Sequence, residues 1–461
     1  MNNLSGKQPK INRTERLLAF VLGFALLANA LAMQVSGIVS ISGFLSTDNV
    51  NQILVVLFVD YALIVAIGSL QSMIIDKFNR VKLIRWVALI FAAVFIILRL
   101  MFLIKAPEWL NYSLMYIISE QQFVVFPLVF WVLANDIFKI SQAKRLFPLI
   151  SGWNFAGKLI GIGIAAISPA LFTTWNFKPE EVLLLNVFVY LVSYLVLTFG
   201  LKDVKIRQTV TRTEDLKMTL SEGWDFIKNV PAFKYLMYAL VALAIADTII
   251  EFRFLVITDQ VFDTQAKYQT FFSIYRLGTT LVALALQTFV TGYLIKRMQI
   301  RNTFFFFPIA ASIAAIGMIL TPGVGVAIGA MALVKLVRDT VHESGRASLL
   351  GFVPEERRGR VSTLMETYFP SFGTMLGCVL AGLVVISGAS SSIDLSLLYL
   401  LIAFLGAMYA FISVVRMVMA YDSSMLNWRL KRRQRRADSV LLRKLTDDDL
   451  LSEVKKEQED G

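Results

Sequence analysis

The sequence predicts an all-α protein that crosses a membrane many times. Of its 461 residues, 57% are hydrophobic and only 17% are charged, and these proportions differ from those of ordinary soluble domains. The apolar residues form runs of about 20, which is the length a helix needs to cross the hydrocarbon core of a bilayer. The longest polar stretch between two runs lies near the middle of the chain. We therefore expect two bundles of membrane-spanning helices joined by a linker.

Twelve apolar runs predict twelve spans, six on each side of the central polar stretch. The first six cover residues 17–41, 53–75, 83–104, 112–135, 146–172 and 182–201. The second six cover residues 233–258, 268–295, 303–320, 324–350, 361–388 and 393–420. The first run follows a basic segment, as a signal peptide would, but it continues too far for one. We expect it to remain as the first span.

The predicted domain plan follows from these runs. It consists of a tail at residues 1–16, a six-helix bundle at 17–201, a linker at 202–232, a second six-helix bundle at 233–420, and a basic then acidic tail at 421–461. Within the linker, the acidic residues after Thr213 predict a short surface helix that runs to Phe226 and ends before Pro231.

The basic residues predict the orientation of the chain. With the N-terminus in the cytoplasm, 36 of the 45 lysines and arginines fall on the cytoplasmic side, and only Lys105, Lys178 and Lys267 fall in the opposite loops. Cytoplasmic loops carry such an excess of positive charge. We therefore expect both termini on the cytoplasmic side of a bacterial cell (inner) membrane. Residues 429–436 would then lie against its anionic inner leaflet. The net charge of +12 then requires no nucleic-acid partner.

The residue inventory argues against an enzyme. The chain has one cysteine and one histidine, too few for a disulfide framework or a metal site built from these residues. It contains neither the phosphate-binding loop of nucleotide hydrolases nor the G-x-S-x-G elbow of serine hydrolases. We predict no catalytic residue, no cofactor and no bound metal.

The two halves share a faint internal repeat. Basic hairpins at residues 142–145 and 355–360 follow the fourth span of each half, and each precedes a helix with two glycines four residues apart. The glycines are Gly157 with Gly161, and Gly373 with Gly377. Small residues at this spacing allow two helix backbones to approach closely. This repeat favours a duplicated 6+6 bundle, the layout of many transporters.

Thirteen lysine, arginine, aspartate and glutamate side chains lie more than four residues inside the ends of the predicted spans. They are Arg99, Lys158, Arg253, Arg276, Lys335, Arg338, Asp60, Glu120, Asp247, Glu251, Asp339, Glu343 and Glu366. Each charge costs roughly 2.5–3.5 kcal/mol at the centre of a membrane-spanning helix. We therefore expect these groups to pair with one another or to line a water-filled cavity.

Three of the cations are expected to bind substrate. Lys158 lies 13 residues beyond Arg145 and so about 20 Å deeper, near the bilayer midplane. Lys335 reaches a similar depth from the other side, and with Arg276 it makes a plausible cationic centre for a small anionic solute. Asn29 in the first span is the fourth predicted substrate-binding residue.

The acidic side chains admit two interpretations. Asp60, Glu120, Asp247, Glu251 and Glu366 either act as counter-ions that neutralise the empty cavity or couple transport to protons or a counter-solute. Asp247 and Glu251 are four residues apart and share a helix face.

The predicted inner gate consists of charged residues near the cytoplasmic ends of the spans. In the tenth span, helical spacing places the polar residues from Lys335 to Arg346 on one face, with Lys335 paired to Asp339 and Glu343 to Arg346. The proposed gate residues are Lys144, Arg145, Arg338, Asp339, His342, Glu343, Arg346, Arg358 and Arg360.

Two segments resemble the ATP:ADP antiporter (nucleotide transporter) family. Residues 130–131, 134–137 and 142–147 are similar to its F-W…A-N-x-[IF]…[EQ]-A-K-R-[FL]-[FY] run, and residues 354–361 look like the second-half hairpin of its bacterial members. The resemblance implies a major-facilitator-like fold and exchange of ATP for ADP without hydrolysis. It suggests a gating role for Asn135, Gln142, Lys144 and Arg145.

The resemblance also implies functional charges in the second, fifth, eighth and eleventh helices. Those helices carry Asp60, Lys158, Arg276 and Glu366 here, and the acid at Asp60 departs from what a polyphosphate site would favour. The leading hypothesis is a secondary transporter of an anionic, nucleotide-like solute such as ATP or ADP, working by alternating access. One alternative is a proton-coupled exporter of cationic or amphipathic compounds. Another is a membrane sensor or scaffold that transports nothing.

Overall fold

The computed structural model describes most of the chain as helices. The described ranges are 12–47, 50–75, 78–175, 179–202, 204, 216–351, 353, 355–388 and 396–424. Within these ranges all regular structure is helical, which confirms the all-α prediction. Most of the predicted N-terminal tail, the first part of the linker and the basic C-terminal tail lie outside the described residues.

The first half of the chain forms six long helices with two short 3₁₀ turns between them. They are α1 (Arg13–Thr47), η1 (Val50–Gln52), α2 (Ile53–Ile75), α3 (Arg80–Leu103), α4 (Glu108–Ile137), α5 (Ile140–Trp175), η2 (Pro179–Glu181) and α6 (Val182–Gly200). The sequence explains one of these starts directly, because the side chain of Asn79 accepts from the backbone N–H groups of Val81 and Lys82 and so caps α3.

The second half begins after a short connecting helix, α7 (Leu216–Asn229). Its elements are α8 (Pro231–Asp259), α9 (Gln265–Ala285), η3 (Leu286–Thr291), α10 (Gly292–Met298), η4 (Ile300–Phe305), α11 (Phe306–Leu320), α12 (Val324–Val337), η5 (Arg338–His342), α13 (Glu343–Leu350), α14 (Glu355–Thr363), η6 (Leu364–Tyr368), α15 (Phe369–Gly388) and a last helix, Ser396–Ser424. The segments η3, η5 and η6 are π-helical and continue the helices on either side of them.

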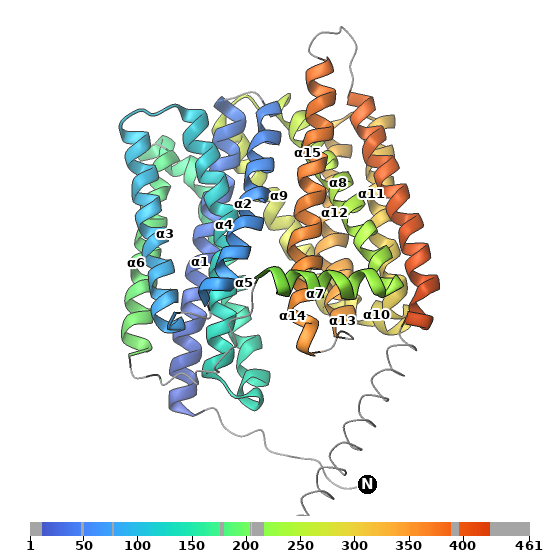
Figure 1. The fold of residues 1–461 in the computed structure, drawn as a ribbon. Coiled ribbons are helices and arrows are strands. Elements are labelled where there is room, and N and C mark those ends of the chain that lie inside the picture. The colour runs from blue at the N-terminus through green and yellow to red at the C-terminus, as the bar shows by residue number, and fades with distance from the viewer. Residues whose placement is uncertain are drawn as a thin grey trace, which may run out of the picture.

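The helices stand side by side in two groups. Figure 1 shows α1 to α6 in one group and α8 to α15 in the other, with α7 crossing the lower ends of the second group. Contacts between the groups are made by α2 against α15 and by α9 against α1 and α5. The surface helix predicted in the linker is therefore present, and the two halves meet along a small number of helix pairs.

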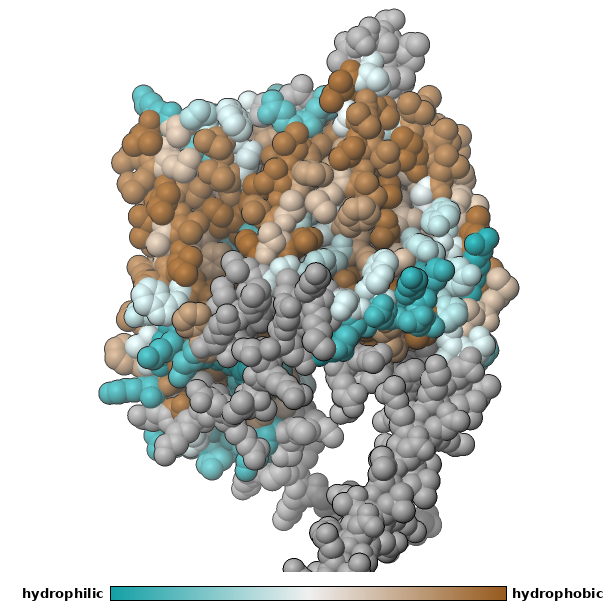
Figure 2. Space-filling model, viewed as in Figure 1, coloured by the Kyte–Doolittle hydropathy of each residue, from teal (hydrophilic) through white to brown (hydrophobic). Residues whose placement is uncertain are grey.

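The outer surface of the bundle is apolar, as a lipid-facing surface must be. Ten helices in the described ranges are long and apolar enough to cross a membrane. Figure 2 shows apolar residues over the sides of the helices and hydrophilic residues around α7 and at the lower end. Large side chains point outward, among them Phe289 at 77% and Ile386 at 72% exposure. A soluble protein rarely exposes so much apolar surface, and this chain is an integral multi-pass membrane protein.

Two further predicted spans lie outside these ten helices. They correspond to α8 and to the continuous run of α12, η5 and α13, and the structure places a helix at both. Each carries several ionisable side chains, including Asp247 and Glu251 in α8 and Lys335 and Arg338 in the other run.

Each half is held together by glycines at a close helix crossing. A Cβ atom at Gly157 would lie 2.3 Å from the Leu27 carbonyl oxygen, and one at Gly161 would lie 2.6 Å from that of Leu31. These contacts join α5 to α1, and neither position has room for a side chain.

The second half repeats this contact between α15 and α8. A Cβ at Gly373 would lie 2.5 Å from the Val241 carbonyl oxygen, and one at Gly377 would lie 3.1 Å from the Thr248 Cβ. The close approach predicted from the two glycine pairs is confirmed in both halves.

We expect Gly161→Ala to destabilise the protein, because the new methyl group would push α5 away from α1. Overpacking of this kind costs about 1–3 kcal/mol of unfolding free energy. Thermal unfolding of the purified protein in detergent measures the effect. The matched control is Gly163→Ala in the same helix, where a Cβ meets no atom within 4 Å and where alanine favours the helix. Equal unfolding temperatures for the two variants would contradict the prediction.

Candidate functional site

Charged side chains from both halves meet where the two groups of helices face each other. Lys158 on α5 lies within electrostatic range of Asp339 on η5. Glu120 on α4 lies within range of Arg276 on α9 and Lys335 on α12. The three cations predicted from the sequence to form one centre are thus brought into a single cluster that spans the interface.

Arg276 is the cation whose position is fixed most clearly. Its Nη1 donates to the Gln34 Oε1 at 3.4 Å across the interface. A Cβ at Gly37 would lie only 3.3 Å from the same nitrogen. The lack of a side chain at Gly37 therefore leaves the space on α1 that the guanidinium of Arg276 occupies.

The two lysines are available to a ligand. Lys158 and Lys335 are both partly buried, and neither forms an ion pair or a hydrogen bond with another residue that the structure describes. A half-buried ammonium group without a bonded partner is stable in a membrane protein only where water or an anion reaches it. This geometry makes the pair the strongest candidates for contacting an anionic solute.

Arg338, by contrast, is neutralised within its own half. Its Nη1 donates to Asp247 Oδ2 on α8, and its Nε donates to Asp339 Oδ1 at 3.0 Å. The sequence predicted that Asp339 would pair with Lys335 instead. The observed arrangement leaves Lys335 without a bonded partner among the described residues, so all three cations of the predicted centre keep their charge.

The predicted single polar face of the tenth span is interrupted at His342. The π-helical turn of η5 holds more residues per turn than an α-helix, so the face on which each later side chain lies is shifted. His342 is 5% exposed and packs edge-on against Phe304 and Phe307, with ring centroids 5.6 and 4.9 Å away. Asp339 and Glu343 remain exposed. His342 is therefore packed inside the second bundle, within electrostatic range of Arg338 and Arg346.

The remaining gate residues are held within one half or tied to the linker. Arg346 binds both carboxyl oxygens of Glu343 at 2.7 Å, as predicted. Arg145 lies 3.7 Å from Glu15 at the start of α1. Arg360 pairs with Glu222 on α7.

Two other residues of the predicted gate complete this end. Arg358 donates to the carbonyl oxygens of Gly351 and Val353 at 3.3 and 3.2 Å. The side chain of Lys144 lies outside the described part of the chain. The ion pairs named here brace single halves and the linker, and a gating role for these residues stays a prediction.

Asn29 lies in a buried polar network of the first half. Its Oδ1 accepts from the Tyr190 hydroxyl at 2.7 Å, and its Nδ2 donates to the Gln122 carbonyl at 3.2 Å. The Gln122 side chain in turn donates to the Tyr190 hydroxyl at 2.7 Å. This network joins α1, α4 and α6. Both polar atoms of Asn29 are therefore engaged in packing, which argues against its predicted contact with substrate.

The acidic residues occupy three different surroundings. Asp60 is 1% exposed, and its Oδ1 accepts from Gln121 at 2.9 Å while its Oδ2 has no bonded partner among the described residues. Glu251 lies within electrostatic range of Asp247, Lys335 and Glu120. Glu366 is exposed in η6. The structure thus places Glu120 and Glu251 near the cations, whereas Asp60 is buried.

Two tyrosines that the sequence did not single out belong to the same cluster. Tyr61 lies within electrostatic range of Glu120 and Glu251, and Tyr275 within range of Glu251 and Arg276. The Tyr275 hydroxyl is buried without a bonded partner among the described residues. Each tyrosine is adjacent in sequence to a charged residue of an apolar run. This adjacency could have identified both tyrosines from the sequence.

Comparison with known proteins agrees with this architecture. Residues 132–377 match the family described as the Major Facilitator Superfamily. The chain belongs to the Major Facilitator Superfamily. No curated protein matches this chain significantly.

Several solved transporters share the fold of this superfamily member. The nucleoside transporter NupG is 15% identical, with a TM-score of 0.60 over 88% of this chain and 100% of its own. A bacterial homologue of the iron transporter ferroportin, in an inward-facing state, is 15% identical with a TM-score of 0.60 over 88% and 98% of the two chains. The peptide transporter PepTSo of the POT family is 13% identical, with a TM-score of 0.59 over 88% and 99%. The chain is a secondary transporter of small solutes, not an enzyme.

We expect Asp247 and Arg338 to be energetically coupled. A double-mutant cycle of Asp247→Asn, Arg338→Gln and the double variant should give a coupling energy of about 1–3 kcal/mol, because hydrogen bonds between charged groups are strong when partly buried. Thermal or denaturant unfolding in detergent measures it. The control cycle uses Asp263 and Lys267, a fully exposed pair at 2.6 Å, for which less than about 1 kcal/mol is expected. Equal coupling in both cycles would show that the Asp247–Arg338 contact does not stabilise the fold.

Proposed function

We propose that this transporter carries a small anionic solute of the nucleotide class, such as ATP or ADP, by alternating access between its two halves. The observation that carries the proposal is the cationic cluster of Lys158, Arg276 and Lys335 at the interface. Lys158 belongs to the first half, and the other two belong to the second.

The chemistry of the cluster favours phosphate or carboxylate groups. Lysine binds phosphate as a compact charge, and arginine adds directed N–H donors. Because these cations repel one another, an anion placed among them would relieve the repulsion and interact with both lysines. The nearby acids Glu120 and Glu251 would balance the cluster when no solute is bound.

The placement of the cations on both halves supports coupling of binding to movement. A solute that contacts Lys158 on one side and Lys335 on the other binds more strongly when the halves are close than when they are apart. Binding would therefore shift the population toward closed states, which is what alternating access requires.

The nucleotide assignment is supported by the sequence resemblance to ATP:ADP antiporters at residues 130–147 and 354–361. The charge asymmetry of the loops supports termini on the cytoplasmic side of a bacterial inner membrane. We propose the same domain plan as the sequence predicts, with the two bundles rocking about the interface and the basic tail on the inner leaflet.

We expect ATP or ADP to raise the unfolding temperature of the purified protein. A ligand present at 100 times its dissociation constant adds about 2.7 kcal/mol to the unfolding free energy. The shift should disappear in Lys158→Ala and in Lys335→Ala, and so should uptake of radiolabelled nucleotide into liposomes loaded with the exchange partner. Lys158→Arg, which keeps the charge, should retain part of both signals.

The control for these variants is Lys267→Ala, which removes an exposed lysine far from the cluster. It should bind and transport like the unchanged protein. Transport that persists in Lys158→Ala and Lys335→Ala would remove the cluster as the binding site. A shift with inorganic phosphate and organic acids but not with nucleotides would retain the anion and reject the nucleotide.

A second candidate is a proton-coupled exporter of cationic or amphipathic compounds. Asp60 favours it, because its buried Oδ2 lacks a bonded partner in the described part of the chain and lies near Glu120. A carboxyl group in such surroundings can bind and release a proton as the conformation changes.

If the second candidate is correct, Asp60→Asn should abolish the dependence of transport on a pH gradient in liposomes. Export of a fluorescent cation, followed with and without the gradient, measures this. Under the leading proposal, the same variant keeps its nucleotide-dependent shift in unfolding temperature. The two outcomes therefore separate the two functions.

A further inference from the structure

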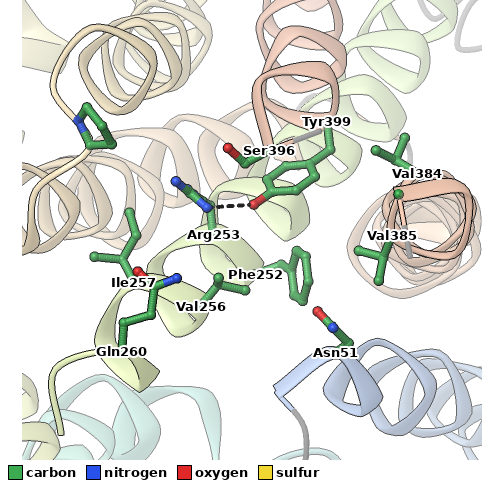
Figure 3. A pocket seen from close by; sticks show the side chains of 12 residues that line it. Asn51, Phe252, Arg253, Val256, Ile257, Gln260, Val384, Val385, Ser396 and Tyr399 are labelled. Carbon is green, nitrogen blue, oxygen red and sulfur yellow. Dashed lines mark hydrogen bonds between the residues drawn. The ribbon is translucent and has the colours of Figure 1, made fainter. Parts of the chain in front are cut away.

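A cavity of about 500 Å³ lies at the end of the bundle opposite the basic hairpins. Its walls come from the end of α8, the end of α15, the start of the last helix and the turn before α12, and η1 of the first half contributes Asn51. Figure 3 shows the side chains that line it. Since Arg253 lies six residues before the end of α8, it is about 9 Å below that end.

Arg253 is the only charged residue among those that line the cavity. It is 8% exposed, and its Nη1 donates to the Tyr399 hydroxyl at 3.0 Å. Its Nε is buried and has no bonded partner, and no carboxylate forms an ion pair with it among the residues that the structure describes. A buried guanidinium without a counter-charge is costly unless water or an anion reaches it, and an anion also neutralises its charge.

The rest of the cavity is divided between apolar walls and a polar rim. Val256 and Ile257 provide aliphatic surface on the helix that carries Arg253, and Val384 and Val385 provide it on the opposite side of the view in Figure 3. Polar side chains stand around them at Asn51, Gln260 and Ser396. Such a cavity fits a ligand that is charged at one end and apolar over the remainder.

We propose that this cavity binds an amphiphilic anion, with its carboxylate or phosphate on Arg253 and its apolar body against the aliphatic wall. Such an anion could come from the aqueous phase or be the head of an acidic membrane lipid. The site is separate from the cationic cluster of Lys158, Arg276 and Lys335 and does not depend on the proposed nucleotide.

Occupation of this cavity has a consequence for the transport cycle. Asn51 belongs to the first half, and every other lining residue belongs to the second. A ligand that contacts both would favour the arrangement in which this end of the two halves stays together. The anion would therefore act on the equilibrium between the open and closed states from outside the transport site.

The test measures apparent affinity from thermal unfolding in a neutral detergent. Benzoate and phenyl phosphate are the soluble probes, and benzyl alcohol is their uncharged analogue. We expect the two anions to stabilise the protein and benzyl alcohol not to. Arg253→Gln should weaken the apparent Kd for both anions by about 10-fold or more, because a charge-assisted hydrogen bond is lost. Arg253→Lys should lose less.

Three further variants keep the test decisive. Val385→Phe fills the cavity from a partly exposed position and leaves Arg253 in place, so it should abolish benzoate binding even if Arg253→Gln does not fold. Lys158→Ala should bind benzoate like the unchanged protein, whereas loss of binding would place the anion in the transport site. Lys267→Gln, at the same end of the molecule, should change nothing. Benzoate binding that survives both Arg253→Gln and Val385→Phe would overturn the proposal.

Nanodiscs distinguish the two sources of the anion. If the ligand is a lipid, nanodiscs of phosphatidylglycerol should raise the unfolding temperature above that in phosphatidylcholine, and Arg253→Gln should remove the difference. If the ligand is soluble, benzoate should stabilise the protein equally in both lipids. The absence of any Arg253-dependent shift with lipid and with both soluble anions would also overturn the proposal.

Discussion

The free-energy cost of charge inside a bilayer constrains how this chain is arranged. A lysine at the depth of Lys158 is tolerated only where water or opposite charge reaches it. The structure meets this requirement by turning the charged faces of α4, α5, α8, α9 and α12 toward the interface between the halves. The lipid-facing sides remain apolar. The interface therefore gathers the ionisable groups that the lipid-facing surface could not accommodate.

Packing inside each half differs from packing between the halves. Within a half, α1 meets α5 and α8 meets α15 at glycines that leave no space for a methyl group. Such contacts resist change, because packed helix backbones cannot slide or separate without loss of contact energy. Between the halves, the described contacts include charged and polar groups such as Arg276 with Gln34. The interface also contains apolar side chains, because one buried cluster includes Ile162 of the first half and Phe272 of the second.

Three π-helical segments lie in the second half, at η3, η5 and η6. The segment η5 carries Arg338 and Asp339, and η6 carries Glu366. A π-turn adds a residue to one helical turn and is frequent at functional sites. Here η5 directs Arg338 toward Asp247 and buries His342 against two phenylalanines. Ideal helical spacing cannot anticipate that change of direction at His342, although the predicted pair of Glu343 and Arg346 forms.

The sequence by itself determined the fold class, because the length of an apolar run and the spacing of small residues follow from bilayer thickness and helix geometry. It also predicted which cations lie deep in the membrane, since depth is proportional to residue number along a helix. Only the tertiary structure decided which side chains meet. Asn29 looked like a cavity residue but bonds to Tyr190 and Gln122, and Arg338 rather than Lys335 binds Asp339. Contacts of this kind depend on the rotation of each helix about its axis, which is set by packing against neighbours far away in the sequence.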